Sequence, residues 1–163
     1  MLQRSRLKSK NNLSGAIALI GNPNSGKTAL FNALTGLNHK VSNYPGVTVE
    51  RKTGSCTIGD DTVEIIDLPG TYSLVPESQD EVIVAMEVDS WMESDHAPAC
   101  IISVVDATNL ERNLYLTSQL LDLGIPVIVA LNMMDLARKK SLAIDAEKLN
   151  STLGTAAIVP ISA

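Results

Sequence analysis

The sequence predicts a single α/β domain in which helices cover both faces of an open, mostly parallel sheet. Its 163 residues suit one domain, and its composition, 45% apolar and 19% charged, suits a folded chain. Short apolar runs alternate with helix-like segments, which is the order typical of this class. Glycine-bearing residues 21–28 follow the first apolar run, which predicts a phosphate-binding P-loop between the first strand and the first helix.

Six segments are predicted to be strands. They are Ala16–Ile20, Val47–Ile58, Thr62–Ile66, Cys100–Val105, Val127–Leu131 and Ala156–Pro160. The second and third are separated only by Gly59-Asp60-Asp61, which favours an antiparallel hairpin. The fourth and fifth are unbroken apolar runs, as in central parallel strands covered on both faces. Residues 37–46 are polar and contain Pro and Gly, so we expect a loop there.

Three helices are predicted between these strands. The first covers Ala29–Leu34 and ends near Gly36. The second has the clearest signals, since Thr108 and Glu111 have the spacing of a capping box and a glycine follows at position 124. The third covers Asp145–Leu153.

Charge and cysteine content exclude several classes of protein. The net charge of -5 argues against general nucleic-acid binding. Cys56 and Cys100 form no CxxC pair, which excludes a disulfide framework and indicates a reducing compartment; both are expected to be small buried apolar residues. No apolar run approaches the ~20 residues that a membrane-spanning helix requires.

The charges are unevenly distributed along the chain. Residues 1–14 are predicted to be a basic, flexible tail, and the domain is expected to occupy residues 15–163. Between Glu77 and Asp95 there are seven acidic residues, Glu81 among them, and no basic one. We expect these acids to form the solvated face of a helix.

Residues 21–28 read GNPNSGKT and match the P-loop pattern G-x-x-x-x-G-K-[ST]. The glycines let the backbone curl so that its N–H groups face an anion, and the following helix adds its positive end. Lys27 is expected to contact the β and γ phosphates, and the Thr28 hydroxyl to bind Mg²⁺. The nucleotide contacts expected here are Gly21, Asn22, Pro23, Asn24, Ser25, Gly26, Lys27, Thr28 and Ala29.

The tetrapeptide NMMD at residues 132–135 indicates guanine rather than adenine. Asp135 can accept hydrogen bonds from N1–H and the 2-amino group of guanine, whereas adenine has neither group. An unsatisfied buried partner costs ~1–3 kcal/mol, and more when it is charged. Asn132 is expected to brace the loop and reach the base, and Met133 to cover a base face. Backbone N–H groups of Ser162 and Ala163 are expected near the guanine O6.

Two further segments are predicted to sense the γ-phosphate. Asp67 can hold Mg²⁺ through water, and the Gly70 N–H can bond the γ-phosphate, so loss of that phosphate would release the loop. Thr48 is the expected second hydroxyl ligand for Mg²⁺. The contacts expected from these segments are Gly46, Val47, Thr48, Asp67, Leu68, Pro69 and Gly70. Thr71 stands where many small GTPases carry the Gln that orients water, so slow intrinsic hydrolysis is expected.

Together these residues resemble the GTP-binding domain of the ferrous iron transport protein B family of bacterial membrane proteins. The resemblance rests on GNPNSGKTALFN at residues 21–32, NYPGVTVE at 43–50, DLPGTYSL at 67–74, and ERNLYLTSQLLDLGIPVIVALNMMD at 111–135. It covers nearly the whole chain from Ala16, and the last stretch is distinctive beyond a general GTPase pattern.

The resemblance implies a Ras-like, six-stranded P-loop domain at the cytoplasmic face of the bacterial inner membrane, which hydrolyses GTP and serves Fe²⁺ uptake. It also implies that K⁺ held by Asn24 stimulates turnover, with Asn24, Lys27, Thr48 and Gly70 as catalytic residues. In that family a further helix, a helical domain and a membrane-spanning region follow. All three are expected to be absent here, which would make the chain a truncated fragment whose partners are those parts, and self-association is a further possibility.

Two other functions are compatible with the nucleotide motifs. An Era-type GTPase acting on ribosomes or tRNA shares this chemistry but should carry a basic RNA-binding module, which does not stand out here. A nucleotide-dependent interaction module with negligible turnover is the second alternative, since the Gln position is Thr71.

Overall fold

The computed structural model describes residues 15–93 and 96–163; the predicted basic tail, 1–14, lies outside them. Its centre is a seven-stranded sheet in the order β2-β3-β4-β1-β5-β6-β7. The strands are β1 (Ile17–Gly21), β2 (His39–Asn43), β3 (Glu50–Ile58), β4 (Asp61–Asp67), β5 (Cys100–Asp106), β6 (Val127–Asn132) and β7 (Ala157–Pro160). Pairs from β4 to β7 are parallel, and those of β2 with β3 and β3 with β4 are antiparallel. The predicted α/β class with a mostly parallel sheet is confirmed.

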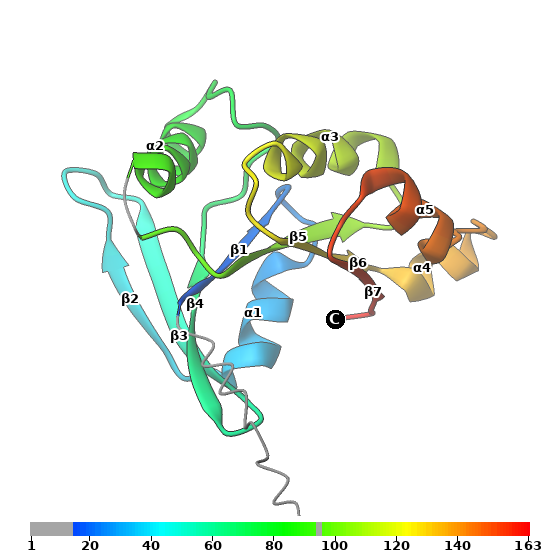
Figure 1. Cartoon of the computed structure of the whole chain (residues 1–163), viewed down its shortest axis with the longest axis horizontal. Helices are drawn as coiled ribbons and strands as arrows, with labels where there is room; N and C mark the ends of the chain where they lie inside the picture. The colour runs from blue at the N-terminus through cyan, green and yellow to red at the C-terminus, as the bar shows by residue number, and fades with distance from the viewer. Residues whose placement is uncertain (1–14, 94–95) are drawn as a thin grey trace, which may run out of the picture.

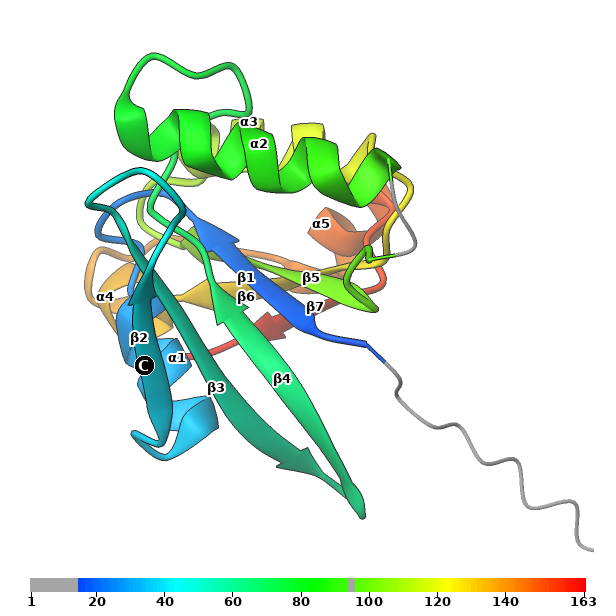
Figure 2. The ribbon, with the colours of Figure 1, turned by 90° about the vertical axis from the view of Figure 1, so that its left-hand side faces the viewer.

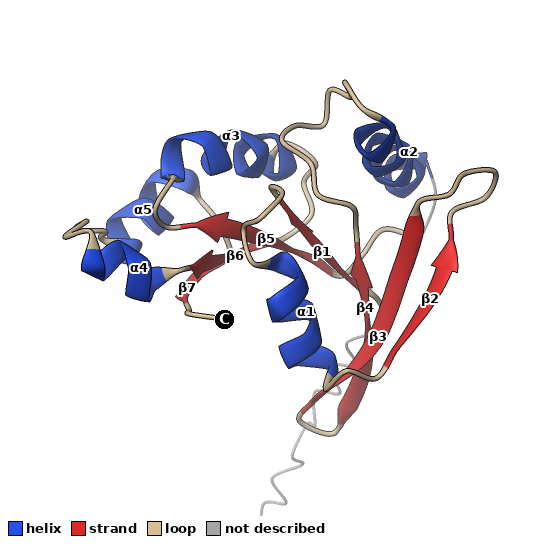
Figure 3. Ribbon diagram, turned by 180° about the vertical axis from the view of Figure 1, so that it is seen from behind, coloured by secondary structure: helices blue, strands red, loops and turns tan. Residues whose placement is uncertain are grey.

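Helices lie on both faces of this sheet (Figure 1). They are α1 (Lys27–Thr35), α2 (Gln79–Glu93), α3 (Leu110–Leu121), α4 (Met134–Lys139) and α5 (Ala146–Leu153). Figure 3 shows α1 lying across the face opposite α2 and α3. None of the helices within 15–93 and 96–163 has the length and apolar character that crossing a bilayer requires.

The central strand β1 contributes to two cores because successive side chains point to opposite faces. Ala18 and Ile20 pack with buried residues of α2 and α3, such as Val84 and Leu120. Ile17 and Leu19 belong to the core under α1, which also contains the buried ring of Phe31. Burial on both faces explains why the strand reads as an unbroken apolar run.

The sheet has one strand more than the six predicted. Strand β2 lies in the segment 37–46 that was expected to be a loop, and it pairs with β3 from His39↔Gly54 to Asn43↔Glu50. Figure 2 shows it at the edge of the sheet beside β3. Every residue of β2 is exposed, so it has no buried face and no alternating apolar pattern. Backbone pairing with β3 decides its conformation.

Three local predictions also need correction. Helix α3 is capped by Asn109 without a side-chain hydrogen bond, so the expected capping box is absent. The Thr108 hydroxyl instead donates to Asp106 Oδ1 at 2.8 Å, and the Thr108 N–H donates to the same oxygen at 2.7 Å. Helix α4 was not predicted, and its six residues are too few to show a helical period. Cys56 and Cys100 are only partly buried, because both pack at the margin of the core under α1.

Glu81 does not lie on a solvated face as expected, since only 8% of it is exposed. Its carboxylate accepts hydrogen bonds from the backbone N–H groups of Tyr72, at 3.2 Å, and Glu77, at 2.9 Å. Hydrogen bonds from these two N–H groups hold the pKa of Glu81 below its usual value of 4.5. Glu81 therefore anchors the loop that joins β4 to α2.

A substitution at Gly54 of β3 would test how closely α1 packs on the sheet. A Cβ at this position would lie 2.9 Å from Thr35 Cβ and closer still to the Thr35 methyl group. We expect Gly54→Ala to lower the free energy of unfolding by ~1–3 kcal/mol through overpacking, measured by urea denaturation. Ser55→Ala, at the next and exposed position of the strand, should cost much less. Thr35→Ser removes the clashing methyl and keeps the hydroxyl, so the double variant should recover part of the loss; no recovery would contradict this contact.

A second prediction concerns the pH dependence of stability. Because the folded pKa of Glu81 is depressed, its stabilising contribution is present above the unfolded pKa, near 4.5, and is lost as pH falls through the lower folded value. We expect Glu81→Gln to destabilise the domain by ~1–3 kcal/mol at pH 7 and progressively less below pH 4.5. Urea denaturation of both proteins from pH 3 to 7 measures this, and a constant difference across that range would exclude an ionic role.

Candidate functional site

The candidate site lies where the carboxyl ends of β1, β4, β5 and β6 meet at one edge of the sheet. Parallel pairing brings these ends together, with Gly21 beside Val104 and Asp106 beside Asn132. The loops that leave these ends contain the P-loop, the DLPG segment and the NMMD segment. Segments more than 100 residues apart in the chain therefore face one another, as ligand sites in open α/β sheets require.

Two glycines allow the P-loop to approach its neighbours closely. A Cβ on Gly21 would lie 2.7 Å from the Val104 carbonyl oxygen. Gly26 has φ 88° and caps the start of α1, and a Cβ there would overlap the amide nitrogen of Asn132. Glycine is therefore required at position 26 both by conformation and by space.

Asn132 connects the P-loop to the end of the chain. Its side chain is fully buried. Nδ2 donates to the Ser25 carbonyl at 3.0 Å, and Oδ1 accepts from the Ala163 N–H at 2.9 Å. The predicted bracing role of Asn132 is thus present as two hydrogen bonds, one to each neighbouring loop.

The loops around residues 133–135 and 161–163 form a second part of the site. The backbone N–H of Asp135 donates to Ser162 Oγ at 3.2 Å, and that of Met134 donates to the Ile161 carbonyl at 3.2 Å. The Asp135 side chain is exposed and therefore accessible to a ligand. Met133 adopts a left-handed conformation, φ 61°, at the start of α4.

A cavity of about 470 Å³ opens above the P-loop. Most residues predicted to bind phosphate line it, and the complete lining is Asn22, Pro23, Asn24, Gly26, Lys27, Thr28, Gly70, Asp80 and Met133. Lys27 Nζ forms an ion pair with Asp67 Oδ1, and both side chains are largely buried. The two charges expected to act on phosphate and metal thus neutralise each other in this structure.

A neighbouring cavity of about 470 Å³ brings three predicted metal ligands together. Thr28, Thr48 and Asp67 all line it, and Lys27, Leu68 and Pro69 lie beside them. Two hydroxyl groups and one carboxylate are hard oxygen ligands of the kind that Mg²⁺ prefers, with several coordination positions left for water and phosphate. The donor set therefore fits Mg²⁺.

Nine predicted contacts line neither cavity: Gly21, Ser25, Ala29, Gly46, Val47, Asn132, Asp135, Ser162 and Ala163. Gly46 and Ala29 are exposed and line neither of them. Val47 instead lines an apolar groove of about 330 Å³ with Tyr44 and residues of α2. Burial of the Tyr44 ring in this groove raises the pKa of its hydroxyl to about 12.

Sequence reasoning missed Gln79 and Asp80, which line the cavities at the start of α2. Both lie in the segment 77–95, whose acidic residues were expected to form only a solvated helix face. The helical spacing of Glu81, Val84 and Val88 would have predicted that the opposite face of this helix packs against the domain. The Thr71 hydroxyl donates to the Ser73 carbonyl at 2.6 Å, and this bond occupies its proton within its own loop.

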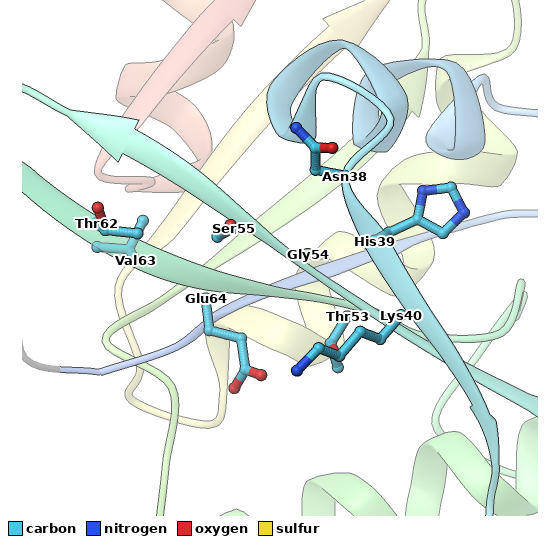
Figure 4. A pocket seen from close by; sticks show the side chains of 9 residues that line it. All are labelled: Asn38, His39, Lys40, Thr53, Gly54, Ser55, Thr62, Val63 and Glu64. Atoms are coloured by element: carbon cyan, nitrogen blue, oxygen red, sulfur yellow. The ribbon is translucent and has the colours of Figure 1, made fainter.

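A larger cavity, about 600 Å³, lies away from these loops over the outer strands (Figure 4). Residues of β2, β3 and β4 line it, among them Lys40, Thr53 and Glu64. None of the predicted site residues does. The cavity of larger volume therefore lies away from the predicted site residues. The convergent polar groups that are typical of ligand sites lie instead at the P-loop edge of the sheet.

Comparison with known proteins agrees with this architecture. The family model for ferrous iron transport protein B matches residues 15–163. The chain is 58% identical over 149 residues to the Fe(2+) transporter FeoB of Legionella pneumophila, covering 89% of this chain and 19% of that protein. The corresponding values for Salmonella typhimurium are 53% over 145 residues, 89% and 18%. The chain thus spans about one fifth of the length of these curated relatives.

Solved structures show the same fold. The cytosolic domain of L. pneumophila FeoB superposes with a TM-score of 0.83 at 56% identity, covering 90% of this chain and 62% of that one. A GDP-bound mutant of S. thermophilus NFeoB gives 0.82 at 51% identity, covering 91% and 55%. The G domain of the T. maritima FeoB transporter gives 0.79 at 43% identity, covering 91% and 87%. This chain belongs to the ferrous iron transport protein B family and corresponds to its P-loop G domain.

Proposed function

We propose that this domain binds GTP with Mg²⁺ and hydrolyses it to GDP and phosphate as the switch domain of an Fe²⁺ transporter. The observation that carries the proposal is the buried Asn132 side chain, which joins the P-loop to the loop beside Asp135. A phosphate cradle and a base-selective carboxylate then belong to one continuous site. GDP-bound structures of S. thermophilus relatives support the nucleotide class.

The proposed nucleotide contacts are those expected from the motifs: residues 21–29, 46–48, 67–70, 132, 133, 135, 162 and 163. P-loop N–H groups and the start of α1 hold the phosphates. Lys27 leaves Asp67 for the β and γ phosphate oxygens, since a phosphate in the cavity competes for its charge. The Gly70 N–H meets the γ-phosphate. Thr28, Thr48 and the released Asp67 would hold Mg²⁺, directly or through water, and the bound ion would supply positive charge to the phosphate oxygens.

Thr48 already lines the cavity with Thr28 and Asp67, whereas Gly46 and Val47 line neither phosphate cavity, so only these two residues have to move inward for this arrangement. We propose that Thr48 would hold Mg²⁺ in the GTP state, which would draw the two residues before it toward the phosphates. Val47 would then leave the apolar groove beside Tyr44. The loop relaxes after hydrolysis, when the γ-phosphate is gone.

Slow intrinsic turnover follows from the groups around the γ-phosphate. Thr71 offers no Gln side chain, and its hydroxyl is used by Ser73. Arg51 lies in β3, where it pairs with Glu87 of α2 at 3.9 Å, and it lines neither phosphate cavity. Asn24 is exposed, lines the phosphate cavity and has a side-chain oxygen suited to a monovalent cation. We propose that K⁺ at Asn24 supplies the missing positive charge.

The proposed location is the cytoplasmic face of a bacterial inner membrane, because the curated relatives of this chain are Fe(2+) transporters several times its length. In such a protein, residues 15–163 act as the nucleotide-dependent part and the helical and membrane-spanning parts are their partners. Whether GTP drives transport or gates it is a property of the whole transporter.

Base selectivity gives the most direct test of this function. Asp135→Asn exchanges an acceptor for a donor, so GTP affinity should fall by at least tenfold and xanthosine triphosphate affinity should rise. Isothermal calorimetry with GTP, ATP and xanthosine triphosphate measures both changes. Asp122→Asn, a surface change at the end of α3, is the matched control and should leave all three affinities unchanged. An unaltered base preference in Asp135→Asn would remove Asp135 from the base site, and equal affinity of the unmodified domain for ATP and GTP would overturn the function.

The potassium role has its own test in single-turnover hydrolysis. We expect cleavage at least tenfold faster in KCl than in NaCl at equal ionic strength. Asn24→Ala should abolish the gain, because it removes the oxygen ligand. Asn38→Ala, on the loop after α1, should retain it. Equal rates in the two salts would contradict the potassium role, and undetectable cleavage in both, with GTP bound, would favour a binding module with negligible turnover.

A further inference from the structure

Helix α3 holds the loop that follows Gly70 at two points. Its contacts are made by Arg112 and Gln119, which are seven residues apart and therefore lie on the same side of the helix, about 10 Å apart along its axis. Both belong to the stretch ERNLYLTSQ at residues 111–119, a distinctive part of this sequence that contributes no predicted nucleotide contact.

The first contact is a stacking interaction. The Arg112 guanidinium carbon lies 4.1 Å from the centre of the Tyr72 ring, within the range of a cation–π contact. The Arg112 backbone carbonyl lies 3.5 Å from Nδ2 of Asn22 in the P-loop, as its acceptor. Residue 112 thus touches both the P-loop and the loop that follows Gly70.

The second contact is a hydrogen bond at the other end of the loop. Gln119 Oε1 accepts from the Leu74 N–H at 2.9 Å. Leu74 packs against the core formed with α2 and α3. Tyr72 and Leu74 are therefore both attached to α3, whereas the N–H of Thr71 donates to the Gly21 carbonyl at 3.1 Å.

Gly70 has little freedom between these attachments. A Cβ on it would lie 3.1–3.3 Å from three atoms of Pro23, so its backbone already lies against the P-loop. Tyr72 is only two residues from Gly70, and Thr71 between them is bonded to Gly21, so a displacement of Tyr72 would act on Gly70 and on the Thr71–Gly21 bond. We propose that Arg112 is a positioning residue for GTP hydrolysis, which acts through the Tyr72 ring to hold the Gly70 N–H at the γ-phosphate.

This inference rests on the proposed function, and it predicts a dependence on the aromatic ring. Arg112→Gln keeps a polar side chain but removes the charge, and should slow single-turnover GTP hydrolysis by about two- to fivefold, the worth of an exposed cation–π contact. Tyr72→Leu should slow it equally. Tyr72→Phe retains the ring and should stay within about 1.5-fold of the unmodified domain.

The double variant Arg112→Gln/Tyr72→Leu decides between positioning and general damage. It should be no slower than either single variant, because both remove one interaction. GDP affinity and thermal midpoint should change little. Tyr115→Leu, an exposed aromatic position on the same helix, is the matched control. The inference would be overturned if the rate loss of the double variant equalled the product of the two single losses. It would also be overturned if Tyr72→Phe were as slow as Tyr72→Leu.

Hydrogen exchange separates failure of this inference from failure of the proposed function. In the GDP-bound domain, Arg112→Gln should speed exchange of the amides of residues 71–75 and leave those of β5 unchanged. If the unmodified domain binds no GTP or does not cleave it, the proposed function fails and a positioning role in hydrolysis fails with it. If it cleaves GTP but neither rate nor exchange responds to Arg112→Gln, only the positioning role is overturned.

Discussion

The architecture of the site depends on one buried amide, that of Asn132. A primary amide can donate and accept hydrogen bonds at once. Here the amide N–H donates to the Ser25 carbonyl, and the amide oxygen accepts from the Ala163 N–H. An apolar residue of similar size would leave both backbone groups unpaired, at ~1–3 kcal/mol each when buried. The absence of a side chain at Gly26 makes room for this amide. P-loop and base loop are thereby held at a constant separation.

The ion pair between Lys27 and Asp67 has a comparable effect on the charges of the site. A buried lysine without a partner would be costly in a cavity of this kind, and Asp67 satisfies it. The same two side chains are those that we propose for phosphate and for Mg²⁺. Binding of a magnesium nucleotide would then replace the Lys27–Asp67 ion pair by two interactions, Lys27 with phosphate and Asp67 with Mg²⁺. Because Asp67 ends β4, this exchange would couple occupancy of the site to the position of β4 and the loop after it.

The loop between β4 and α2 contacts three side chains of the two neighbouring helices. Glu81 receives two backbone N–H groups from it, Gln119 receives a third, and the Arg112 guanidinium stacks on Tyr72. Helices α2 and α3 therefore share one loop. The movement of Gly70 that we propose between nucleotide states would therefore act on the hydrogen bonds that attach residues 72–77 to these helices.

Sequence alone determined the parts of this protein that are local in the chain. The P-loop is a run of eight residues with its own conformational requirements, and buried parallel strands such as β5 and β6 show as unbroken apolar runs because both faces are covered. Tertiary structure decided the rest. Strand β2 exists through backbone pairing with β3, and Glu81 is buried because the folded loop before α2 turns the N–H groups of Tyr72 and Glu77 toward its carboxylate. Asn132 meets Ser25 across 107 residues of sequence, and only the packing of parallel strands brings such groups within bonding distance.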